Sequence, residues 1–211
     1  MLSVIIPVFN GAEFLPQALA SIQRSPLPKE IIIVDDGSTD DTAALVKNLG
    51  QAVIYLRQEN RGPAAARNRG LELARGEFIG FLDADDLWAE NHPRAALARL
   101  EKEDVDLVFG QTQCFIGAPV GPTFHTYQLG SAVCHRRLID KIGRFNSEMR
   151  RGEDVDWFLR ARDSGTNIAR LSELSLYFRL HSGNRPHVHE ATRAGLLSAL
   201  HQSLQRRKSA V

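Results

Sequence analysis

The sequence predicts an α/β fold with a mixed, mainly parallel central sheet flanked by helices, and three observations lead to it. Apolar runs at residues 2–8, 30–34 and 78–82 each stop at polar residues, as buried parallel strands do. The segment 11–23, between the first two runs, places apolar residues at helical spacing. Strands that alternate with helices in this way are typical of βαβ units.

The same alternation continues through the first half of the chain. Pro63 lies near the start of the third helical segment, where its missing N–H costs little. The helix after the acidic cluster at residues 83–86 leads into a further apolar run. The expected strands are 2–8, 30–34, 52–56, 78–82 and 105–109, and the expected helices are 11–23, 40–49, 61–74 and 91–103.

The pattern changes after Gln111. A turn-rich segment, 117–122, separates two short runs at 113–116 and 123–127, which predict an antiparallel patch. A helix at 154–163, a strand at 174–180 and a helix at 190–206, with Leu197, Leu200 and Leu204 on one face, complete the predicted elements. The basic residues Arg206, Arg207 and Lys208 end the last helix, where they either oppose its dipole or contact a membrane surface or a partner.

Composition favours one soluble enzyme domain. A chain of 211 residues with 43% hydrophobic content can bury one sizeable core. The chain has 26 Lys and Arg residues and 25 Asp and Glu residues. Its net charge is therefore too small to attract nucleic acid. The expectation is a cytoplasmic protein, because no apolar run reaches transmembrane length and Met1 leads straight into a strand. Cys114 and Cys134 suggest neither a disulfide framework nor a metal knuckle.

An acidic cluster follows the strand at 78–82. Asp83, Asp85 and Asp86 fall within four positions, and carboxylates this close repel one another unless a cation lies among them. Mg²⁺ or Mn²⁺ prefers one or two carboxylates together with substrate phosphate oxygens, which favours a phosphorylated ligand. The alternative is an acidic turn that caps the next helix.

Three predicted strands end in polar residues at one edge of the sheet. They end near Val8, Val34 and Leu82, and open α/β sheets bind ligands at the carboxyl edge of their strands. The residues after Val34 are Asp35 and Asp36, followed by Ser38 or Thr39 as a helix N-cap. Capping and ligand binding are compatible here.

Several segments in order resemble the family 2 glycosyltransferases, whose GT-A fold transfers a sugar from a nucleotide donor to an acceptor hydroxyl with inversion. The resemblance covers residues 1 to about 181. Its motifs are Ser-Val-Ile-Ile-Pro-Val-Phe-Asn at 3–10, Val-Asp-Asp-Gly-Ser-Thr-Asp at 34–40, the segments 59–70 and 76–86 with Asp-Ala-Asp-Asp at 83–86, and Gly-Glu-Asp-Val-Asp-Trp-Phe-Leu-Arg at 152–160.

The resemblance implies a single GT-A domain over residues 1–211. Residues 1–110 would bind the nucleotide sugar, 111–186 would form the acceptor side and 187–211 a C-terminal helix. It implies a UDP-sugar donor, a saccharide or lipid-linked acceptor and a Mn²⁺ or Mg²⁺ ion. Asp35 would contact the nucleobase; the remaining implied donor-binding residues are Pro7, Phe9, Asn10, Asp36, Arg61, Arg67, Asp83, Ala84 and Arg179.

The resemblance also implies the metal ligands and the catalytic base. Asp85 is the first metal ligand, with Asp83 and His181 beside it in a DXD-type motif. Asp154 is the expected base that removes the acceptor proton, and Glu153 positions the acceptor. Carboxylates in a first helical turn are also explained by capping alone. The elements at 143–145 and 177–184 match the family, although Asn184 and Pro186 depart from its pattern.

Other classes fit the sequence less well. A nicotinamide-dependent oxidoreductase would need Gly-x-Gly-x-x-Gly where residues 7–12 read Pro-Val-Phe-Asn-Gly-Ala. A sugar-phosphate nucleotidyltransferase would need a glycine-rich loop with a basic residue after the first strand, and the sequence has none there. The alternative that stays open is a catalytically silent nucleotide-sugar-binding or scaffold protein of the same fold.

Overall fold

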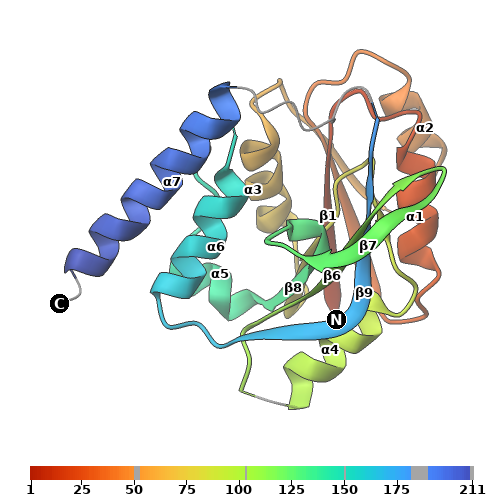
Figure 1. Ribbon diagram of the computed structural model, residues 1–211. Coiled ribbons are helices and arrows are strands. Elements are labelled where there is room, and N and C mark those ends of the chain that lie inside the picture. The colour runs from red at the N-terminus through yellow and green to blue at the C-terminus, as the bar shows by residue number, and fades with distance from the viewer. Residues whose placement is uncertain (50–52, 103, 150, 182–189, 210–211) are drawn as a thin grey trace.

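The computed structural model describes residues 1–49, 53–102, 104–149, 151–181 and 190–209 (Figure 1). Its strands are β1 (Leu2–Val8), β2 (Lys29–Asp35), β3 (Ile54–Arg57), β4 (Phe78–Phe81), β5 (Leu87–Trp88), β6 (Leu107–Ile116), β7 (Ala118–His125), β8 (Ala132–His135) and β9 (Ile168–Arg179). Its helices are α1 (Leu15–Gln23), α2 (Thr42–Asn48), α3 (Pro63–Leu73), α4 (His92–Lys102), α5 (Arg136–Ile142), α6 (Glu153–Asp163) and α7 (Glu190–Ser209), with a 3-10 turn at Leu129–Ser131.

The described strands form one mixed sheet, as the sequence predicts. Its strand order is β3-β2-β1-β4-β8-β6-β9-β5, and β7 pairs with β6 as an extra edge. The strands β3, β2, β1 and β4 are all parallel, so their carboxyl ends meet at one edge. The strand β8 runs antiparallel to both of its neighbours, β4 and β6. The first four strands therefore form the half-sheet that can bind a ligand at its edge.

Helices cover the sheet on both faces (Figure 1). On one face, side chains of α1, α2 and α4 pack against Leu2, Val4 and Ile6 of β1. On the other face, side chains of α3, α5 and α6 pack around Ile5 of β1 and Phe81 of β4. The two sets alternate along β1 because successive strand side chains point to opposite faces. The three-layer core holds the sheet edge rigidly.

The second half of the chain differs from the prediction in several elements. The runs expected at 105–109 and 113–116 are one long strand, β6, and its partner β7 continues through Pro119 and Pro122. Prolines are tolerated there because β7 is an edge strand, exposed throughout. The strand β8 and helix α5 were not predicted. β9 begins at Ile168, six positions before the expected strand, and pairs parallel with β6.

The last helix, α7, lies against α6 on the outside of the molecule (Figure 1). It turns Ala199 and Ser203 inward, while Leu197, Leu200 and Leu204 are 58%, 48% and 57% exposed. The predicted leucine face is thus the outer face. Among the described residues, no helix is long and apolar enough to cross a membrane.

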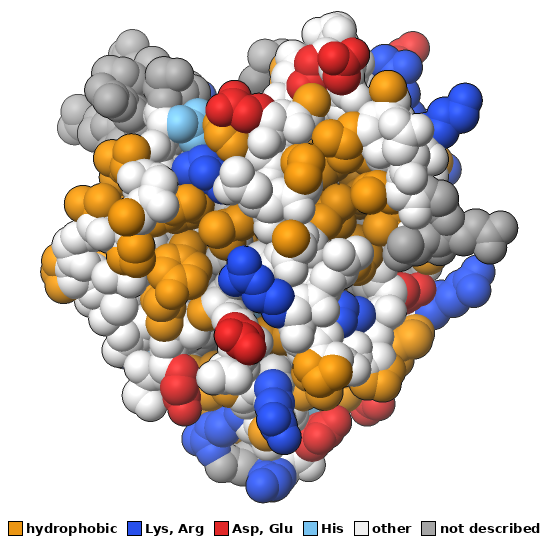
Figure 2. All heavy atoms as spheres, turned by 90° about the vertical axis from the view of Figure 1, so that its right-hand side faces the viewer, with side chains coloured by type: hydrophobic (Ala, Val, Ile, Leu, Met, Phe, Trp, Pro, Cys, Tyr) orange, Lys and Arg blue, Asp and Glu red, His pale blue; other side chains and the backbone are white. Residues whose placement is uncertain are grey.

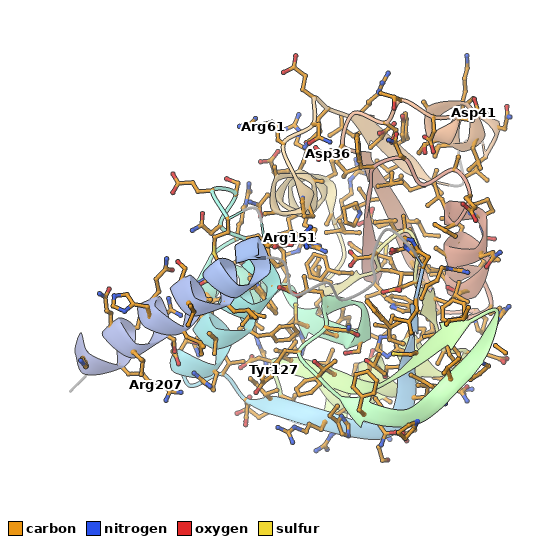
Figure 3. The ribbon with its side chains drawn as sticks, turned by 45° about the horizontal axis from the view of Figure 1, so that its top comes forward. Asp36, Asp41, Arg61, Tyr127, Arg151 and Arg207 are labelled. Atoms are coloured by element: carbon orange, nitrogen blue, oxygen red, sulfur yellow. The ribbon has the colours of Figure 1, made fainter. Side chains whose placement is uncertain are left out.

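The basic end of α7 makes hydrogen bonds that the sequence does not predict. Arg206 Nε and Arg207 Nε donate to the Asp163 carboxylate at 3.2 and 3.0 Å, and Arg207 lies at the far end of α7 in Figure 3. Although burial raises the pKa of Asp163, hydrogen bonds from Ser203 and these arginines hold it below its usual range. The two arginines therefore tie α7 to α6, beyond any effect on the helix dipole.

Charged side chains are interspersed on the surface that α1 and α2 cover. Figure 2 shows Lys and Arg alternating with Asp and Glu on this face, with hydrophobic side chains between them. This mixture agrees with the net charge of +1. A ligand must therefore be recognised by local groups, as the composition predicts.

Candidate active site

A cavity of about 900 Å³ opens at the edge of the sheet where β1, β2 and β4 end. This is the edge at which the sequence places the polar residues. The start of α3 forms one side of the cavity, and the start of α6 closes it from the other half of the chain. The lining side chains that the sequence singles out are Pro7, Phe9, Asn10, Asp36, Arg67, Asp83, Ala84, Asp85, Glu153, Asp154 and His181.

The loop after β1 forms the outer wall of the cavity. Asn10 adopts φ +52°, a left-handed conformation that Asn tolerates better than most residues. Its Oδ1 accepts the backbone N–H of Thr39 at 2.7 Å, and its own N–H donates to Ser38 Oγ at 2.9 Å. Phe9 is 52% exposed beside it. Asn10 therefore joins the ends of β1 and β2 and leaves the Phe9 ring open to a ligand.

Asp35 is fully buried behind the cavity. Its Oδ1 accepts the Ser38 N–H and its Oδ2 accepts the Tyr55 hydroxyl, both at 2.7 Å. Burial and this hydrogen bond to Asp35 raise the pKa of Tyr55 to about 12. Asp35 is not among the described residues that line the cavity. The structure therefore gives Asp35 a role in joining β2 to β3.

Asp36 is the carboxylate of this pair that reaches the cavity wall. Its oxygens accept the backbone N–H groups of Arg61 at 2.9 Å and Gly62 at 2.8 Å, just before α3. Gln58 Nε2 donates to the same carboxylate at 2.7 Å. The Arg61 side chain is exposed and lies outside the lining set, so Arg61 reaches the site only through its backbone (Figure 3).

The acidic loop after β4 divides into two half-buried carboxylates, Asp83 and Asp85, and one buried carboxylate, Asp86. Asp86 is 3% exposed and accepts the Arg179 N–H at 2.8 Å. Burial, followed by the charges of Asp85 and Asp83, raises the pKa of Asp86 well above its usual range. Asp85 Oδ2 lies 2.9 Å from His181 Nε2. Asp83 and Asp85 thus face the cavity, while Asp86 anchors the loop to β9.

Arg179 supports this loop from behind. Its guanidinium lies between two aromatic rings, 4.8 Å from the centroid of Phe14 and 4.4 Å from that of Phe115. Its Nε donates to the backbone carbonyl of Asp85 at 2.6 Å, and its Nη2 to Gln17 Oε1 at 2.7 Å. Arg179 lies outside the described lining of the cavity, so its contacts fix the shape of the Asp85 loop.

Arg67 joins the two halves of the cavity. It is 4% exposed, and it donates from Nη2 to Asp83 at 2.7 Å and from Nη1 to Glu153 at 2.8 Å. Burial disfavours this cation, yet the charges of Asp83 and Glu153 raise the pKa of Arg67 above its usual range. Because Asp83 follows β4 and Glu153 begins α6, this one side chain fixes the distance between the two sides.

Asp154 lies beside this bridge at the first turn of α6. Its Oδ1 accepts the Val155 N–H at 2.8 Å, within the first turn of the helix. Burial, and then the charge of Glu153, raise the pKa of Asp154 to about 6, although Arg67 opposes the shift. A carboxylate with this pKa is largely ionised at neutral pH and basic enough to accept a proton. Glu153 is instead held by Arg67.

The comparisons with known proteins agree with this geometry. The family model described as "Glycosyl transferase family 2" matches residues 3–165, more than half of the chain. The chain belongs to glycosyl transferase family 2. Among curated members, it is 34% identical to the "PGL/p-HBAD biosynthesis glycosyltransferase" of Mycobacterium bovis, over 81% of this chain and 73% of that protein. It is 29% identical to "Succinoglycan biosynthesis protein ExoU" of Rhizobium meliloti, over 77% of this chain and 57% of that protein.

Solved structures of similar proteins establish the GT-A fold. S. aureus TarS 1-349 in complex with UDP-GlcNAc superposes with a TM-score of 0.83, 21% identity and coverage of 97% of this chain and 66% of that chain. The mannosyltransferase PcManGT from Pyrobaculum calidifontis, in complex with GDP-Man and Mn²⁺, gives a TM-score of 0.72 and 22% identity over 97% of this chain and 64% of that chain. The chain spans about 60% of the first two curated relatives.

The family implies a divalent cation, and the donor set at the acidic loop fits one. The described residues contain no group of three or more His, Cys, Asp or Glu side chains arranged as a closed metal site. Asp85 and His181 nevertheless place one oxygen and one nitrogen 2.9 Å apart at the cavity wall. Two protein ligands suit Mg²⁺ or Mn²⁺, which keep several positions for water and phosphate oxygens. Asp83 Oδ1, by contrast, is held by Arg67.

Two lining residues escaped the sequence analysis. Gln128 follows β7, and its buried Oε1 has no hydrogen-bond partner among the described residues. Arg151 precedes α6 and lies near the start of α7 in Figure 3. Neither belongs to a recognisable motif, so only the tertiary fold brings them here. Trp88 belongs to the core: it is 1% exposed and donates from Nε1 to the Gly130 carbonyl at 2.8 Å.

Proposed function

We propose that this protein is an inverting glycosyltransferase that moves a sugar from a nucleotide-diphosphate donor to an acceptor hydroxyl. The observation that carries the proposal is the arrangement of one cavity. Asp154, a carboxylate with a pKa of about 6, lies on one side of it. Asp83 and Asp85 lie on the other, and Arg67 bridges Asp83 to Glu153 beside Asp154.

The donor nucleotide is proposed to occupy the half of the cavity formed by β1, β2 and α3. Asp36 takes the nucleobase role in place of Asp35, because Asp36 lines the cavity, whereas Asp35 is fully buried behind it. Phe9, half exposed beside it, offers an aromatic face to the base. We expect a uridine donor, which agrees with the UDP-GlcNAc bound to TarS, whereas PcManGT holds GDP-Man.

Transfer follows from the position of Asp154. Its carboxylate takes the proton of an acceptor hydroxyl, and the acceptor oxygen then forms a bond to the anomeric carbon as the bond to the nucleotide diphosphate breaks. A single displacement of this kind inverts the anomeric centre. Glu153, fixed by Arg67, orients the acceptor. A divalent cation held by Asp85 and His181 would neutralise the diphosphate. The acceptor is expected to be a saccharide or lipid-linked hydroxyl.

The stereochemistry of the first-formed product tests this proposal. An α-linked UDP-sugar donor should give a β-linked product, which the anomeric coupling constant in proton NMR reveals. Where no acceptor is known, slow donor hydrolysis can be followed in the same way, with the β-anomer appearing first. Retention at the anomeric carbon would exclude single displacement. Binding of UDP-sugars without any hydrolysis or transfer would instead favour the silent, binding-only alternative.

A further inference from the structure

The outermost helix touches the polypeptide just before the proposed base. Gly195 of α7 lies so close to residue 151 that an added Cβ would stand 2.2 Å from the Arg151 carbonyl oxygen. From the other side, a Cβ on Gly152 would stand 3.1 Å from the Gly195 carbonyl carbon. Real Cβ atoms do not approach other atoms within 3.0 Å without a shift. The contact therefore joins one backbone directly to another, and only glycine fits.

The same helix is fastened to the other end of α6. Arg206 and Arg207 donate to Asp163, the last residue of α6. Arg162 Nη2 donates to Ser203 Oγ at 3.1 Å, and Ser203 is 2% exposed. α7 therefore contacts α6 along its length, from the residues before Glu153 to Asp163. Its register against α6 is fixed at both ends.

We propose that α7 sets the position of the catalytic base, and that Gly195 is a positioning residue. Gly152, in a left-handed conformation at φ +81°, is the residue from which α6 starts, and Glu153 and Asp154 are the next two. A displacement of the Arg151–Gly152 backbone would therefore move Asp154 relative to the donor half of the cavity. This inference rests on the proposed function, because it assigns the helix a role in the same transfer reaction.

A purely structural role for Gly195 makes the opposite prediction. Within a helix, Gly is about 0.5–1 kcal/mol less favourable than Ala. If the contact only packed α7 onto the domain, the Cβ of Ala at 195 would weaken that packing and lower the free energy of unfolding, but turnover would not change. The paired arginines at the far end would still hold α7. A loss of turnover is expected only if the close approach itself positions Asp154.

The first test compares Gly195→Ala with Ser198→Ala, an exposed position on the same helix. Gly195→Ala should lower the turnover number at least tenfold, because misplacement of a reacting group by about 1 Å can cost 10²-fold. The KM for the donor and the stabilisation by UDP should stay within twofold of wild type, since the donor half is untouched. Ser198→Ala should match wild type in all three measurements.

The second test approaches the same contact from α6. Gly152→Ala introduces a side chain at a left-handed residue that also faces Gly195. Gly165→Ala is the matched control, because Gly165 has φ +69° and open space around its Cβ position. Both substitutions carry the backbone strain, but only Gly152→Ala meets α7. The expected loss of turnover, at least tenfold, should therefore appear in Gly152→Ala and be absent from Gly165→Ala.

Three results would overturn the proposal. The first is a turnover number equal to wild type in Gly195→Ala. The second is an equal loss of turnover in Gly152→Ala and Gly165→Ala. The third is loss of UDP-dependent stabilisation in Gly195→Ala, which would mean that Gly195 has a general role in folding. A wild-type protein that transfers or hydrolyses no donor would contradict the proposed function before any variant is compared. Near-normal transfer by Asp154→Asn would show that Asp154 is not the catalytic base. Gly195 would then have no base to position.

Discussion

At the scale of single residues, the chemistry depends on where each carboxylate is buried. Asp154 and Glu153 are neighbours, yet Arg67 contacts Glu153 at 2.8 Å while Asp154 contacts a backbone N–H. Asp154, the carboxylate that Arg67 does not hold, has its pKa raised to about 6. This difference supports the proposed roles, in which Asp154 takes the acceptor proton and Glu153 orients the acceptor.

Asp154→Asn should separate catalysis from capping. The Asn side-chain oxygen can still accept the Val155 N–H, so α6 should remain intact. The ability to take a proton is lost, and turnover should fall by about 10²- to 10⁴-fold. UDP affinity should be nearly unchanged. Asp41→Asn, at an exposed position before α2 (Figure 3), serves as the control. Near-normal turnover would mean that Asp154 is only a capping residue.

The rate should depend on pH through the same carboxylate. A base must be ionised, and the pKa of Asp154 is raised to about 6. The turnover number should therefore be constant above about pH 7 and fall about tenfold for each pH unit below 6. A profile of turnover from pH 4.5 to 8.5 measures this limb. A rate that rises as the solution becomes more acidic would contradict the assignment.

Asp35→Asn and Asp36→Asn should have different effects. Asp35 accepts two internal hydrogen bonds and is fully buried, so Asp35→Asn should lower the free energy of unfolding by about 1–3 kcal/mol. Asp36→Asn changes a buried carboxylate that accepts three internal hydrogen bonds, so it should also cost stability, but it alone should lower UDP affinity, about tenfold or more. Urea unfolding and titration calorimetry measure the two effects. An unchanged UDP affinity in Asp36→Asn would exclude its nucleobase role.

The sequence indicated most of these residues. It placed Asp83, Asp85, Glu153 and Asp154 in one site, and the structure brings all four to one cavity. It assigned the nucleobase to Asp35, whereas Asp36 is the residue that lines the cavity, because Tyr55 reaches across from β3 to Asp35. That contact is set by strand register, which no local pattern in the sequence reports.

At the scale of elements, α3 and α6 are joined through Arg67. Arg67→Met should lower the free energy of unfolding by about 3 kcal/mol, because it leaves the buried Glu153 carboxylate without its cation. Turnover should fall as well, since the two sides of the cavity lose their bridge. Arg69→Met is the control: it removes an exposed pair with Glu72 on the same helix and should cost less than 1 kcal/mol. Equal effects on unfolding would contradict the bridging role.

Elements with strong periodicity were predictable, and those stabilised by their neighbours were not. The parallel strands β1, β2 and β4 are continuous apolar runs. The strand β8, Ala-Val-Cys-His, is only four residues long, and it exists because β4 and β6 pair with it on both sides. β7 contains two prolines, and it can still be a strand because an edge strand pairs on one side only, here with β6. Pairing of this kind depends on residues that are distant in the sequence.

At the scale of the whole molecule, the fold places the two sides of the cavity on different parts of one sheet. The parallel half forms the edge at which we propose that the nucleotide binds, and the antiparallel strands lead the chain back to α6 across the cavity. α7 then packs on α6 from outside (Figure 1). The curated relatives from Rhizobium meliloti and Haloferax volcanii match this chain over only part of their own length, 57% and 62%.

The most direct test of the central claim is the thermal unfolding midpoint with UDP, measured with Mn²⁺ and with a chelator, in wild type and Asp85→Asn. UDP at 100 times its dissociation constant should stabilise the wild-type protein by about 2.7 kcal/mol when Mn²⁺ is present. Chelation should reduce this stabilisation because Asp83 and Asp85 then repel the diphosphate. Asp85→Asn should reduce it because the cation loses a charged ligand. If neither UDP nor another nucleoside diphosphate raised the midpoint under any condition, the cavity would not be a nucleotide-sugar site.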